Sequence, residues 1–154
     1  MLSRSKPLFA GALPAMRQRT FIPLIYYFLI LFISYTFMNK LSALHSFQVN
    51  LLKTGLYSLD VAKQLSYLVL AGELGVLIAL LFFKKAGSVL LFAMLTVFTL
   101  YICLLRLLGR YEVCGCGGVL NGLEFRYHLL INLGLVVLSW LLLKDSIKKN
   151  NYEN

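Results

Sequence analysis

The residues of this chain best suited to chemistry are two cysteines separated by one glycine, Cys114-Gly115-Cys116. Two cysteines this close can form a small disulfide ring, because the intervening glycine relaxes the backbone. We expect such a ring to be strained, and strained, exposed disulfides tend to be labile and catalytic. Arg110 and the more distant Arg106 precede the pair, and nearby cations lower the pKa of a cysteine thiol. The motif therefore predicts a redox-active pair.

Two other interpretations of the cysteine pair stay open. It could be a structural clip, although a ring of three residues removes little chain entropy. It could instead bind zinc together with His128 and Cys103, although the spacing differs from the usual Cys-x₂₋₄-Cys pairs. We favour the redox pair and expect no metal site. Cys103 itself is interpreted as a small apolar filler, with a resolving thiol that reaches Cys114 or Cys116 as the alternative.

Four long uncharged stretches must position these cysteines. They cover residues 20–39, 64–83, 86–105 and 127–143, and only Glu73 interrupts them. A transmembrane helix needs about 20 mostly apolar residues. The composition agrees, since 60% of the residues are hydrophobic and the mean hydropathy is +0.80, against about 45–50% apolar residues in soluble domains. The pattern predicts an all-α, antiparallel four-helix transmembrane bundle over residues 20–143.

The segment that follows the first stretch predicts one further, shorter helix. Leu44, Phe47, Leu51 and Leu52 recur at helical spacing, which is typical of an amphipathic helix lying at the membrane interface. We expect Gly55 to end this helix.

The Lys and Arg counts predict the orientation in the membrane. With the N-terminus inside, nine cations are cytoplasmic and six are outside, which follows the positive-inside rule. The basic tail 1–19 and the tail 144–154 are then cytoplasmic. The loops 40–63 and 106–126, and with the latter the cysteine pair, face the periplasm of a bacterial inner membrane. The net charge of +9 indicates contact with the lipid bilayer rather than with nucleic acid.

Polar residues inside or beside the predicted spans complete the candidate site. Glu73 is the tenth residue of its stretch, and ionisable groups at such depth are rare and usually functional. We interpret it as a proton acceptor or a polar contact for a quinone, with interhelical packing as the alternative. His128 and Asn132 are four residues apart at the start of residues 127–143, so they share a helix face. His128 is a candidate catalytic residue, and Asn132 a second candidate quinone contact.

These features together resemble the MauE/DoxX-like redox-associated integral membrane proteins. The resemblance covers about residues 20–143 and rests on Lys40 closing the first span, Glu73 inside the second, and Cys-Gly-Cys-Gly-Gly followed by His128 and Asn132. It implies that Cys114 and Cys116 are the redox pair and that Glu73 and His128 support them. It also implies a periplasmic thioredoxin-like or secreted thiol protein as partner, and a membrane complex in some relatives. It says nothing of Cys103, Arg106 or Arg110.

Quinone-coupled disulfide generators of the vitamin K epoxide reductase type are similar in architecture, but they relay electrons through two cysteine pairs. This chain has three cysteines, so either the partner supplies a second pair or the protein is not itself an electron conduit. The function predicted is a membrane component of extracytoplasmic thiol–disulfide exchange, a quinone-linked thiol–disulfide oxidoreductase. The alternative is a non-catalytic anchoring or assembly subunit whose cysteine loop only docks a partner.

Overall fold

The computed structural model of the chain describes residues 12–110 and 124–153, with side chains over 21–110 and 124–148. The described residues form helices and no strands. Four helices are long and apolar enough to cross a membrane, which confirms the predicted fold class. They are α1 (Ala12–Ser42), α3 (Leu59–Phe82), α4 (Lys84–Leu107) and α5 (Phe125–Glu153). Their apolar spans within the described residues are Phe21–Ser42, Leu59–Phe82, Lys84–Leu107 and Phe125–Lys148.

A short helix, α2 (Leu44–Lys53), follows α1 as the sequence predicts. It buries Phe47 and Leu51 against α3. Gly55 stands two residues after its end with a φ of 64°, a left-handed conformation that glycine adopts without steric cost. The prediction that Gly55 ends the helix is confirmed.

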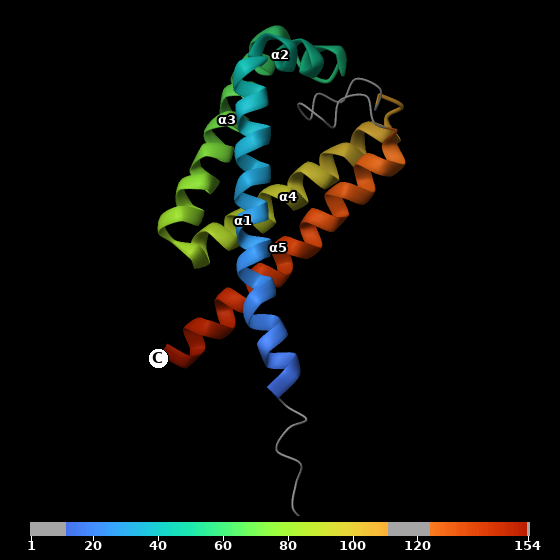
Figure 1. Cartoon of the computed structure of the whole chain (residues 1–154). Helices are drawn as coiled ribbons and strands as arrows, with labels where there is room; N and C mark the ends of the chain where they lie inside the picture. Colours follow the sequence, from blue (N-terminus) through green and yellow to red (C-terminus); the bar gives the residue numbers. More distant parts are fainter. Residues whose placement is uncertain (1–11, 111–123, 154) are drawn as a thin grey trace, which may run out of the picture.

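The long helices form two antiparallel pairs that meet at one end of the bundle. Figure 1 shows α1 beside α3, with α4 and α5 together leaning away from α1 toward the α2 end. Helix α4 packs on both α3 and α5, and α1 packs on α3 and α5. One end of the bundle holds α2, the start of α3, the end of α4 and the start of α5 (the α2 end), and the other holds the α3–α4 turn.

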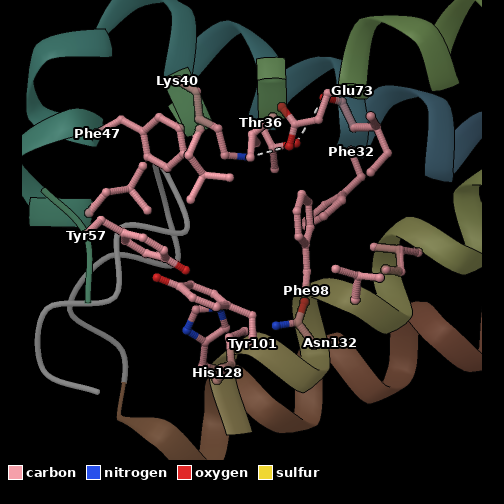
Figure 2. Close-up of a pocket in the computed structure, with 17 residues that line it drawn as sticks. Phe32, Thr36, Lys40, Phe47, Tyr57, Glu73, Phe98, Tyr101, His128 and Asn132 are labelled. Atoms are coloured by element: carbon pink, nitrogen blue, oxygen red, sulfur yellow. Dashed lines mark hydrogen bonds and ion pairs between the residues drawn. The ribbon is translucent and has the colours of Figure 1, made fainter. Parts of the chain in front are cut away.

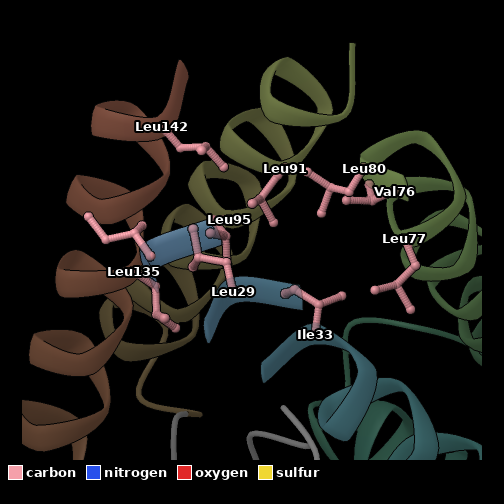
Figure 3. Packing of buried hydrophobic residues seen from close by; sticks show 10 residues of the cluster. Leu29, Ile33, Val76, Leu77, Leu80, Leu91, Leu95, Leu135 and Leu142 are labelled. Carbon is pink, nitrogen blue, oxygen red and sulfur yellow. The ribbon is translucent and has the colours of Figure 1, made fainter. Parts of the chain in front are cut away.

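The half of the bundle near the α3–α4 turn has a continuous apolar core (Figure 3). Leucines from all four long helices meet in it, among them Leu29, Leu80, Leu91, Leu95 and Leu135. The large side chains on the outer faces are also mostly apolar, as expected for helices surrounded by lipid. Each long helix is therefore apolar on its inner face and on its outer face, and the buried polar residues are the exceptions.

Close approach of α3 and α4 depends on a single glycine. One residue, Phe83, separates the two helices, and the Gly87 amide donates to its carbonyl at 2.8 Å. A Cβ on Gly87 would lie 2.5 Å from the backbone N and Cα of Leu80. This contact is too short for any side chain, so the tight turn requires glycine here.

Candidate functional site

A cavity of about 260 Å³ lies between the two helix pairs at the α2 end. Helices α1, α2 and α3 contribute one wall, and α4 and α5 contribute the facing wall (Figure 2). The lining is mainly aliphatic and aromatic, with a few polar side chains. The lining residues are Phe32, Ile33, Thr36, Lys40, Phe47, Leu51, Tyr57, Leu65, Val69, Glu73, Leu95, Val97, Phe98, Tyr101, Ile102, His128 and Asn132.

An ion pair forms the polar part of the first wall. The Nζ of Lys40, in the last turn of α1, donates to Oε1 of Glu73 in the interior of α3. The side chains are 5% and 1% exposed, so water screens this pair very little. The ammonium group also lies 5.5 Å from the centre of the Phe98 ring. A buried charge is tolerated only when it is paired, and these two residues satisfy each other's charge.

The second oxygen of the Glu73 carboxylate differs from the first. Oε2 is buried and has no hydrogen-bond partner among the residues that the structure describes. A buried acceptor without a partner is costly. Glu73 lines the cavity, so this unpaired acceptor is buried beside the cavity, in the same carboxylate that binds the ammonium group of Lys40.

His128 and Asn132 form the polar part of the facing wall. Both lie near the start of α5, where the His128 amide donates to the carbonyl of Glu124 at 3.1 Å. Their positions four residues apart place both side chains on the inner face, and they are 1% and 6% exposed. Figure 2 shows them opposite Lys40 and Glu73, on the side of the cavity that Tyr101 also lines. The predicted site residues Glu73, His128 and Asn132 thus line one cavity.

The two predicted arginines lie at the α2 end with different contacts. Arg110 Nη1 donates to the carbonyl of Thr54 at 2.6 Å, which joins the segment after α4 to the turn between α2 and α3. Arg106 lies over the ring of Phe125 at 5.6 Å from its centre, which joins the end of α4 to the start of α5. Both arginines therefore hold helix ends together around the cavity.

The predicted catalytic cysteines are only partly covered by the structure. Cys114 and Cys116 lie outside the described residues. Cys103 lies on α4 as a half-buried free thiol, and it is not among the residues that line the cavity. Within the described residues, no group of three His, Cys, Asp or Glu side chains could hold a metal ion.

Sequence reasoning missed several residues of this site. Lys40 was counted as a cation at a helix end, and no partner was named for Glu73. Thr36, Phe47 and Tyr57 also line the cavity. In the sequence, their residue types and positions do not differ from those of residues that face lipid. The available signal for Lys40 was physical: a charged residue inside a span predicts a partner of opposite charge on another helix.

The fold and the cavity define a multi-pass helical membrane protein with a buried polar site. Residues 18–145 match the family described as methylamine utilisation protein MauE. The match covers most of the chain, and the chain belongs to this family, as the sequence resemblance predicted. The DoxX-like relation stays a prediction. No curated protein and no solved structure matches the chain.

Proposed function

We propose that this protein is a membrane component of extracytoplasmic thiol–disulfide exchange that passes electrons from a partner's thiols to a quinone. The observation that supports this most is the cavity, because it joins an apolar, aromatic lining to a buried ion pair inside the membrane-spanning part of the fold. Pockets of this kind, mostly apolar with a few convergent polar groups, are typical ligand sites.

The chain connectivity supports a role for the cysteine pair at this cavity. Cys114 is four residues beyond Arg110, whose side chain contacts the α2–α3 turn. An extended chain spans at most about 3.6 Å per residue, so Cys114 is within about 14 Å of Arg110 along the chain. We propose that the pair works at the α2 end, which faces the periplasm of a bacterial inner membrane if both tails are cytoplasmic.

A quinone fits the residues that line the cavity. A dry cavity of about 150 Å³ can hold benzene, so about 260 Å³ has room for a substituted ring, and Phe32 and Phe98 offer aromatic surfaces. Lys40 and Asn132 carry N–H donors that can bind ring carbonyls. A bound quinone would accept two electrons and two protons.

The protein's own part of the reaction is thiol–disulfide exchange. A partner thiolate attacks one sulfur of the Cys114–Cys116 disulfide, which forms a mixed disulfide and releases the other sulfur as a thiolate. The partner's second thiol then attacks the mixed disulfide, which leaves the partner oxidised and the pair as two thiols. Overall, a partner dithiol and a quinone give a partner disulfide and a quinol, so two electrons and two protons are transferred.

The partner is proposed as a periplasmic thioredoxin-like or secreted thiol protein. The family description refers to methylamine utilisation, and a secreted protein of such a pathway that needs disulfides would be a suitable client. A membrane complex is a further candidate partner.

Purified protein in liposomes, supplied with reduced thioredoxin as the probe dithiol and a short-chain ubiquinone, tests the proposal. We expect protein-dependent quinol formation that is abolished in Cys114→Ser and in Cys116→Ser and retained in Cys103→Ser. The proposal is overturned if both loop variants form quinol at the wild-type rate. If a variant with both loop cysteines replaced by serine still co-purifies with its client and still functions in vivo, the result would instead support a docking subunit.

A further inference from the structure

Lys40 and Glu73 offer a donor and an acceptor side by side on the wall of the cavity. Lys40 uses one N–H in its bond to Glu73 Oε1, and an ammonium group has three. Oε2 of Glu73 has no hydrogen-bond partner among the described residues, and an ionised carboxylate only accepts. A ligand that satisfies both groups must therefore donate one hydrogen bond and accept another at nearly the same point.

A hydroxyl group meets this requirement, whereas a carbonyl or an ether oxygen meets only half of it. A hydroxyl can donate to Oε2 and accept from Nζ through the same oxygen. A carbonyl or ether oxygen accepts from Lys40 but leaves Oε2 without a partner, and it adds a second negative dipole beside the carboxylate. Loss of a hydrogen bond to a charged group lowers affinity by roughly ten- to a hundredfold.

The rest of the cavity indicates what carries the hydroxyl. Phe32, Phe98 and Tyr101 line it together with aliphatic side chains, and about 260 Å³ exceeds the roughly 150 Å³ that holds benzene. An aromatic ring can pack against these side chains with its hydroxyl at the ion pair. The helices around the cavity are long and apolar enough to span a membrane, so a ligand that dissolves in the lipid can reach the cavity from the bilayer.

We propose that the cavity is a binding site selective for a lipophilic ring bearing a free hydroxyl, with Glu73 Oε2 as its acceptor and Lys40 as its donor. This inference deepens the proposed function, on which it rests for the natural ligand: the site favours the hydroxyl-bearing quinol over the carbonyl-bearing quinone. The reduced form is then retained at the site more strongly than the oxidised form.

The test uses two probes of similar size, 4-heptylphenol and its methyl ether, in which a methyl group replaces the donating hydrogen. Binding is measured by equilibrium dialysis in detergent, with each probe's partition into empty micelles subtracted. The proteins are the wild type, the variant Lys40→Met/Glu73→Met, and Lys84→Met as a control that removes an exposed cation outside the cavity lining. All three also carry Cys114→Ser and Cys116→Ser, so failure of thiol exchange cannot affect the result.

We expect the wild type to bind the phenol at least about tenfold more tightly than the ether. The preference should fall to within about twofold in Lys40→Met/Glu73→Met and persist in Lys84→Met. Equal affinities in the wild type, or a preference that survives loss of the ion pair, would overturn the inference. Failure of both probes to bind saturably would also overturn it.

Discussion

The two halves of the bundle use the same four helices but pack them in opposite ways. Near the α3–α4 turn, leucines fill the interior and the Tyr26 hydroxyl donates to the Leu80 carbonyl at 2.6 Å. Toward the α2 end, the helix pairs enclose a cavity whose walls carry an ion pair, a histidine and an asparagine. Apolar packing in the first half holds the helices together, whereas the second half encloses a cavity and a buried ion pair. The contrast shows that apolar packing fills the interior near the α3–α4 turn, whereas the α2 end depends on a buried ion pair beside a cavity.

The largest effect should follow from breaking the ion pair on one side. Lys40→Met leaves the Glu73 carboxylate buried without its cation, which should cost about 3–5 kcal/mol of unfolding free energy. Replacing both residues in Lys40→Met/Glu73→Met should recover most of this loss, because buried pairs can often be replaced by apolar residues. Unfolding in mixed detergent–SDS micelles measures both variants. A Lys40→Met protein as stable as the wild type would contradict the role of the pair.

A smaller effect should come from the filled half of the bundle. Gly87→Ala would place a Cβ 2.5 Å from the Leu80 backbone, so α3 and α4 must separate, at a cost of about 1–3 kcal/mol. Gly134→Ala is the matched control, since a Cβ there meets nothing within 4 Å; it should be neutral or stabilising by about 0.5–1 kcal/mol. The same unfolding assay compares them, and equal stability of the two variants would show that this turn is not closely packed.

The contact between Arg110 and Thr54 should matter less for stability than for activity. Arg110→Gln removes the bond to the Thr54 carbonyl, at a cost of about 1 kcal/mol. Because this bond holds the segment that leads to the cysteine pair, thioredoxin oxidation should slow while binding of 4-heptylphenol stays unchanged. Arg126→Gln, the loss of an exposed cation at the start of α5, is the control. An equal effect on the rate in both variants would show that Arg110 acts through its positive charge and not through its hydrogen bond to Thr54.

The smallest effect is expected at Cys103. Its thiol is half-buried and outside the cavity lining, so Cys103→Ala should change stability by less than about 0.5 kcal/mol and leave the exchange rate unchanged. Mass mapping after rapid alkylation provides the second readout. A disulfide from Cys103 to Cys114 or Cys116 in any trapped state would reinstate it as a resolving thiol.

The sequence was sufficient to predict the helices because lipid imposes a long apolar run on each span. The short helix α2 was equally predictable, since its apolar residues recur at helical spacing. The cavity-lining residues Glu73, His128 and Asn132 also stand out in the sequence, because ionisable and amide side chains in these apolar runs are few. What they do chemically stays a prediction.

The pairing of Lys40 with Glu73 was not predictable in the same way. The two residues are 33 positions apart, and only the packing of α1 against α3 decides that they meet. The cavity was also invisible, because an apolar residue that faces lipid, a neighbouring helix or a void has the same hydropathy. Phe32 and Phe98 line the cavity, and nothing in the sequence separates them from phenylalanines on the outer face.

The most direct test of the account is a single turnover of the reduced protein. Purified Cys103→Ala protein with both loop cysteines reduced receives one equivalent of short-chain ubiquinone, and the thiols are then alkylated and mapped by mass spectrometry. We predict one Cys114–Cys116 disulfide per quinol formed, and much slower formation of both when Lys40→Met/Glu73→Met is also present. Two alkylated thiols after exposure to the quinone, or the same rate without the ion pair, would contradict a link between the cysteine pair and the cavity.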